Sequence, residues 1–86
     1  MQTITTATGK AFRVNWCGVS TIDSVLRFGV KGESMIDVLQ VFMDAAETET
    51  LVHTFDEHSS EYDGYIVFRG VDLKPNGEIV VSLSQE

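Results

Sequence analysis

Residues 62–83, YDGYIVFRGVDLKPNGEIVVSL, contain two runs of β-branched and aromatic residues on either side of Lys74-Pro75-Asn76-Gly77. Proline fixes φ at the first turn position, asparagine suits the next position, and glycine accepts a positive φ. The segment therefore predicts a β-hairpin that turns at these four residues.

The register of this hairpin decides which side chains share a face. If a type I turn is closed by a glycine bulge, Leu73 pairs with Glu78 and Phe68 lies opposite Leu83. The face expected to point to the core carries Ile66, Phe68, Ile79, Val81 and Leu83. The other face carries Val67, Arg69, Val71, Val80, Ser82 and Ser84. We expect this mixed face to be covered by another layer of the chain or by a partner.

The remaining segments complete an α+β pattern. Alternating residues predict a second hairpin from 2–6 and 10–16, turned at Thr8-Gly9, and single strands over 21–30 and 49–55. Ser34 is placed to cap a helix from Met35 to about Ala46, and Asp56–Asp63 is expected to be a polar loop. We therefore expect about six antiparallel strands, mostly in hairpins, in a curled sheet or small barrel with one helix packed on it. Residues 1–86 are expected to form a single α+β domain.

Alternation also predicts which residues of the other strands point inward. The expected core residues are Phe12, Val14 and Trp16 in one strand and Leu26, Phe28 and Val30 in another.

The chain is acidic, with 13 Asp and Glu residues against six Lys and Arg residues and a formal net charge of −7. The imbalance is local, because the segment from Asp44 to Asp63 contains no Lys or Arg. Its seven acids, a candidate acidic surface, are Asp44, Glu47, Glu49, Asp56, Glu57, Glu61 and Asp63. An acidic chain of this kind disfavours direct binding to nucleic acid, whose phosphates need a basic patch.

Neither membrane insertion nor secretion is expected. No apolar run approaches the roughly 18 residues of a membrane span, and residues 1–6 lack the pattern of a signal peptide. Cys17 is the single cysteine, which excludes an internal disulfide and fits a reducing cytoplasm.

Two groups of residues are candidates for a chemical site. Residues 53–58, HTFDEH, offer two imidazoles and two carboxylates to a metal, but their spacing matches no metal motif, and a solvated acidic loop is the simpler interpretation. Cys17, with His53 or His58 as base, is a candidate nucleophile, but a buried structural thiol is the more ordinary interpretation. No phosphate-binding or triad motif occurs, so we expect no enzyme activity, no metal and no cofactor.

Two surfaces remain as candidate interaction sites. The first is the mixed face of the closing hairpin, with Val67, Arg69, Val71 and Val80. The second is the acidic surface, for which an ordinary solvated face is the alternative.

Several short motifs are spread along nearly the whole chain: Thr8-Gly9, residues 45–48 (AAET), 51–55 (LVHTF), 62–65 (YDGY) and 76–83 (NGEIVVSL). Together they resemble short uncharacterised proteins carried in phages and prophages of Gram-positive bacteria. The resemblance implies a small structural or accessory protein that oligomerises or docks onto a virion component. It transfers no site residue.

The leading hypothesis is a non-enzymatic interaction or assembly protein whose partner is another protein or a second copy of itself. The alternative is an acidic protein that binds a basic partner, as a DNA mimic that inhibits a nucleic-acid-binding protein. The expected location is the bacterial host cytoplasm or the virion.

Overall fold

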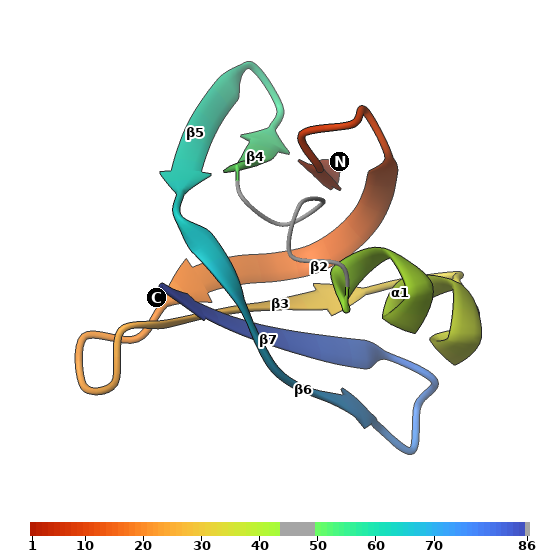
Figure 1. The fold of residues 1–86 in the computed structure, drawn as a ribbon. Coiled ribbons are helices and arrows are strands. Elements are labelled where there is room, and N and C mark those ends of the chain that lie inside the picture. Colours follow the sequence, from red (N-terminus) through yellow and green to blue (C-terminus); the bar gives the residue numbers. More distant parts are fainter. Residues whose placement is uncertain (44–49, 86) are drawn as a thin grey trace.

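The computed structural model describes residues 1–43 and 50–85. Within these residues the chain forms seven strands and one helix, so the α+β class is confirmed, while the expected number of strands was one too low. The elements are β1 (Gln2–Thr5), β2 (Ala11–Val19), β3 (Val25–Val30), α1 (Met35–Phe42), β4 (Thr50–Phe55), β5 (His58–Asp63), β6 (Tyr65–Leu73) and β7 (Ile79–Gln85) (Figure 1).

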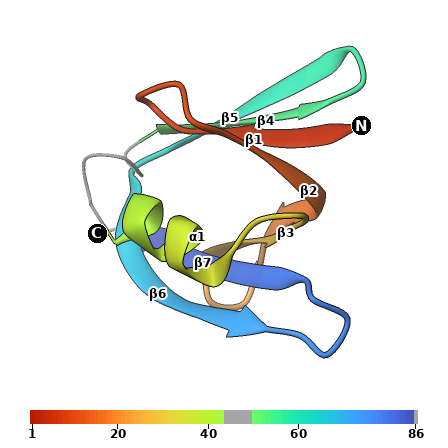
Figure 2. The ribbon, with the colours of Figure 1, turned by 90° about the vertical axis from the view of Figure 1, so that its right-hand side faces the viewer.

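All seven strands belong to one antiparallel sheet in the order β5-β4-β1-β2-β3-β7-β6. The sheet is curled, but it does not close into a barrel, because β5 and β6 are its two edges. Figure 2 shows the result as two layers, with β5, β4 and β1 in the upper layer and β3, β7 and β6 in the lower one. The helix lies in the open mouth between these layers.

The helix is held by its cap and by one apolar side. Ser34 Oγ accepts a hydrogen bond from the backbone N–H of Asp37 at 3.2 Å, as expected of an N-cap. Val38 and Phe42 are fully buried, whereas Ile36 on the opposite side is 67% exposed. The predicted continuation of this helix to Ala46 lies outside the described residues.

The core fills the space between the two layers and the helix. The Phe42 ring lies 5.3 Å from the ring centres of both Phe12 and Phe28, so the helix is packed against β2 and β3. The other buried apolar residues of this cluster are Ile4, Val14, Leu26, Val30, Val38, Leu51, Tyr65, Ile79, Val81 and Leu83.

The closing hairpin forms, but its register differs from the predicted one. The turn is closed by a bond from Gly77 N–H to Lys74 O, and Leu73 pairs with Ile79 rather than with Glu78. Phe68 nevertheless lies opposite Leu83, as predicted, because a β-bulge between Phe68 and Gly70 takes up the extra residue.

The bulge moves Val71 to the other face of the sheet. Val71 lies opposite Val81, which is fully buried, and packs against the core. The register therefore places Val71 on the side of Val81 rather than with Val67, although Val71 also lines a surface hollow together with Arg69 and Val80. A bulge in β2, between Val14 and Trp16, also changes the side on which residues lie. It moves Trp16 out of the core, where it was predicted, and turns Cys17 inward.

Two other boundaries were wrong. β2 continues to Val19 and β3 begins only at Val25, with a turn between them, whereas a single strand was predicted from Thr21. Residues 58–63, predicted as loop, form the edge strand β5. Its sequence HSSEYD has no alternation of apolar and polar residues that would predict a strand. The strand is ordered by backbone pairing with β4.

Candidate functional site

The lower layer of the sheet has one face that no described element covers. The helix lies on its inner side, so the outer side of β3, β7 and β6 is open (Figure 2). Arg27 of β3 and Gly70 of β6 both lie opposite Ser82 of β7 in the register. Because Gly70 has no side chain and Ser82 has a short one, the surface is recessed between the longer side chains on either side of these two residues.

This recessed row forms a hollow of about 350 Å³, which we call the outer hollow. It is lined by Arg27, Arg69, Gly70, Val71, Asp72, Val80 and Ser82. Its size is within the range of small ligand sites, and it would admit a protein side chain.

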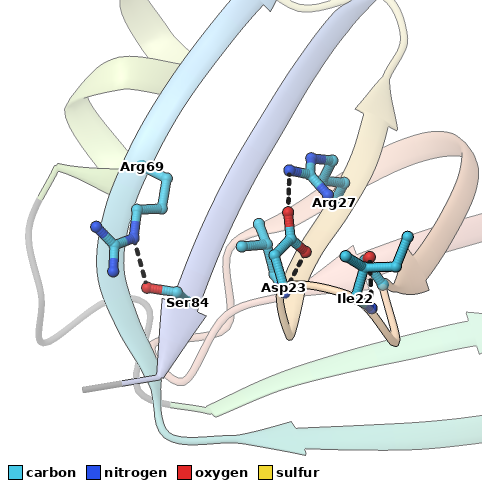
Figure 3. Close-up of polar contacts among 7 residues, drawn as sticks. Ile22, Asp23, Arg27, Arg69 and Ser84 are labelled. Atoms are coloured by element: carbon cyan, nitrogen blue, oxygen red, sulfur yellow. Dashed lines mark hydrogen bonds and ion pairs between the residues drawn. The ribbon is translucent and has the colours of Figure 1, made fainter.

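Arg27 is held at one side of the outer hollow by the turn that precedes β3 (Figure 3). Its Nη2 donates to Asp23 Oδ2 at 3.0 Å, while Asp23 Oδ1 accepts from the backbone N–H of Val25. These two hydrogen bonds lower the pKa of Asp23 to about 2, and the bond from Arg27 contributes most. The same turn presents Ile22 to solvent at 96% exposure.

Arg69 lies at the other side, beyond β7 (Figure 3). Its Nε donates to Ser84 Oγ at 2.7 Å. Because serine is neutral, this contact orients the guanidinium group without offsetting its charge. Asp72, also on the wall, is 3.9 Å from Lys74 Nζ. Among the described residues, Arg69 is thus the cation of the outer hollow that has no carboxylate beside it.

Trp16 covers the neighbouring part of the outer face. A side-chain carbon on Gly29 would come within 2.7 Å of Trp16 Nε1, so the indole occupies space that any larger residue at position 29 would need. The indole N–H donates to Glu78 Oε1 at 3.5 Å, and Asn15 also donates to Glu78. Gly29 pairs with Val80, which lines the outer hollow, so the only tryptophan of the chain lies next to it.

The opposite layer ends in an acidic hairpin, formed by β4, β5 and the turn at residues 56–57. The carboxylates on this hairpin are all exposed: Asp56, Glu57, Glu61 and Asp63. The N-terminal ammonium group lies 3.4 Å from Asp56 Oδ1. No Lys or Arg occurs between residues 50 and 63, so the hairpin is a compact negative surface.

The histidines do not converge on a common point. His53 pairs with Ser60, and His58 pairs with Phe55 at the end of the hairpin. His53 Nε2 lies 2.9 Å from Gln2 Oε1 and donates to it, because an amide oxygen can only accept. Among residues 1–43 and 50–85, no group of three or more His, Cys, Asp or Glu side chains is placed to hold a metal ion.

Cys17 lies on the inner side of β2, where it packs against the core. Burial raises the pKa of its thiol to about 11, although a hydrogen bond with the Tyr62 hydroxyl acts in the opposite direction. The thiol is therefore protonated at neutral pH, and a protonated thiol is a poor nucleophile.

We expect the pKa of Cys17 to make stability depend on pH in the alkaline range. The unfolded thiol ionises near pH 9.0 and the native thiol near pH 11, so the native state keeps the proton longer. Stability is then fully present below pH 9 and falls as the pH rises toward about 11. Urea unfolding across this range should show a smaller fall for Cys17→Ser than for the wild type. Equal slopes for the two proteins would contradict this assignment.

The structure brings together some of the sequence-predicted surface residues and separates others. Arg69 and Val80 line the outer hollow, and Val67 lies on the same face, opposite Ser84. Val71 contributes to the wall of the hollow but packs against the core. Asp44, Glu47 and Glu49 lie outside the described residues.

Sequence reasoning missed Arg27, Gly70 and Ser82 as partners in one row. Their alignment depends on the β3–β7–β6 order, in which β3 and β7 are far apart in the chain. The only signal available was the pair of small residues, Gly70 and Ser82, in the closing hairpin.

In the part of the chain that the structure describes, no helix is long and apolar enough to cross a membrane. Comparisons with protein-family models, with curated proteins and with solved structures returned no match for this chain.

Proposed function

We propose that this protein is a non-enzymatic assembly module that binds a carboxylate-bearing protein surface through the outer hollow. The observation that carries the proposal is the position of Arg69, held by neutral Ser84 at the side of an open hollow. Arginine at such a site binds carboxylates through two parallel hydrogen bonds. The resemblance of the chain to phage and prophage proteins supports a structural or accessory role in a virion.

The surroundings of Arg69 support binding of a protein rather than of a free ion. Trp16, which is 39% exposed, and half-buried Val67 add apolar surface to the same face, and Val80, which is 8% exposed, lines the hollow. Tryptophan and arginine are the residues most enriched where interfaces draw most of their binding energy. A carboxylate side chain entering the hollow would therefore bring its own backbone onto an apolar rim.

Titration with a hexaglutamate peptide tests this proposal, with Trp16 fluorescence as the readout. We expect the peptide to change the emission, because the indole lies beside the outer hollow. Arg69→Gln should weaken binding about tenfold or more, the effect of losing a charge-assisted hydrogen bond. Raising the salt concentration should weaken binding to the wild type as well.

Arg13→Gln is the matched control, because it removes the same charge from β2 outside the outer hollow. It should change the affinity less than twofold, roughly the effect expected of a distant charge in salt. Equal weakening by Arg13→Gln and Arg69→Gln would mean that only the overall charge matters, and the proposal would be abandoned.

A second candidate function rests on the acidic hairpin, whose exposed carboxylates favour a basic partner. In this alternative the protein occupies the nucleic-acid-binding surface of another protein as a DNA mimic. Glu57→Gln and Glu61→Gln would then abolish capture of a lysine-rich peptide, while Arg69→Gln would leave it unchanged. Retained capture by the two glutamine variants would argue against this alternative.

A further inference from the structure

We propose that the outer hollow of one copy binds the acidic hairpin of a second copy, so that the chain assembles head to tail. This inference rests on the proposed function, because it names the carboxylate-bearing partner of the outer hollow. Glu57, in the two-residue turn between β4 and β5, is the side chain that would enter beside Arg69.

The two surfaces lie on opposite sides of the molecule. The acidic hairpin belongs to the upper layer (Figure 2). The outer hollow is lined by residues of β3, β6 and β7, the strands of the lower layer. Figure 1 likewise shows β4 and β5 at one end and β6 and β7 at the other. Because the core and helix lie between them, the surfaces cannot meet within one chain, and contact requires another molecule.

The acidic hairpin and the lining of the outer hollow differ in charge. The acidic hairpin carries Asp56, Glu57, Glu61 and Asp63 without any Lys or Arg. The outer hollow, by contrast, is lined by two arginines, Arg27 and Arg69, and one aspartate, Asp72. Each copy thus presents one surface that complements the opposite surface of the next copy.

The shape of the hairpin suits the outer hollow. Its turn contains only Asp56 and Glu57, with Asp56 at a positive φ of 54°, so the projecting end is narrow. Asp56 lies beside the N-terminal ammonium group, whereas Glu57 and Glu61 are exposed on the same hairpin. One carboxylate can therefore enter the hollow while a second remains at its rim.

The net charge of −7 does not prevent this association. The molecule measures 29 × 29 × 28 Å, so charges on the far sides of two touching copies are separated by well over the Debye length of about 10 Å at 0.1 M salt. Repulsion between these distant charges is then largely screened, whereas the attraction between a carboxylate and Arg69 in contact with it is not. Because the two contact surfaces differ, the interface is heterologous and leads to rings or filaments rather than closed twofold dimers.

Sedimentation of the full chain tests the inference. At about 0.1 M salt, ion pairs in contact are screened less than charges that lie far apart. Under these conditions the wild type should form species larger than a dimer of the 9.5 kDa chain. Arg69→Gln and the double variant Glu57→Gln/Glu61→Gln should each weaken association about tenfold or more. The controls are Arg13→Gln and the double variant Glu33→Gln/Asp37→Asn, which change the same charges elsewhere and should assemble like the wild type.

A mixture of the two deficient variants gives the sharpest result. Arg69→Gln retains its acidic hairpin, and Glu57→Gln/Glu61→Gln retains its outer hollow, so one contact can form between them. We expect a capped 1:1 heterodimer that neither variant forms alone. A wild type that remains monomeric, or a mixture that fails to pair, would overturn the inference. Binding of hexaglutamate that is weakened by Arg69→Gln would still support the proposed function in that case.

Discussion

Replacing Phe42 with alanine should destabilise the fold by about 3 to 5 kcal/mol, the usual cost of removing a buried phenylalanine ring. Phe42 is fully buried, and its ring lies between those of Phe12 and Phe28 at 5.3 Å from each. The change therefore leaves a cavity where the helix meets the curled sheet. Helices this short are marginal in water without packing, so we expect α1 to lose its order as well.

Urea unfolding followed by circular dichroism measures this effect, and Ile36→Ala is the matched control. Ile36 lies on the same helix but is 67% exposed, so its truncation should change the free energy of unfolding by less than about 0.5 kcal/mol. Comparable losses for the two variants would show that the helix is not anchored through Phe42.

The α+β class was predictable because it follows from local patterns. Alternation identified most of the strands, and Ser34 marked the start of the helix at the residue that caps it. The position of β5 could not be predicted in this way, because the pattern HSSEYD does not distinguish a polar edge strand from a loop. Its order comes from backbone bonds to β4, which side-chain periodicity does not encode.

The outer hollow was less predictable than the fold, for a reason visible in β6. The strand contains two bulges, between Tyr65 and Val67 and between Phe68 and Gly70, and each changes the face of the residues that follow. The predicted pairing at the turn was off by one residue, and the bulge between Phe68 and Gly70 shifts the pairing back by one residue. Phe68 therefore lies opposite Leu83, as predicted. Residues 70–73, between the turn and that bulge, pair one position away from the prediction. Among them, Val71 was predicted on the outer face but packs against the core.

Replacing Val71 with aspartate should therefore destabilise the protein by about 2 to 3 kcal/mol, as expected when a carboxylate is placed against an apolar core at a half-buried position. Val71 lies opposite fully buried Val81 and packs against the core cluster. The predicted register instead placed it on the outer face, where the cost would be small. Urea unfolding near neutral pH distinguishes these two registers.

Val67→Asp is the matched control, because it makes the same change on the same strand but on the outer face, opposite Ser84. We expect it to cost only about 1 kcal/mol, typical of a half-buried surface position. The two variants should also differ in their response to pH. Burial raises the pKa of an aspartate above its unfolded value of about 3.9, so the native state of Val71→Asp binds the proton more tightly. Its stability should then recover as the pH falls toward that raised pKa, whereas that of Val67→Asp should not, and equal losses at every pH would place Val71 on the outer face after all.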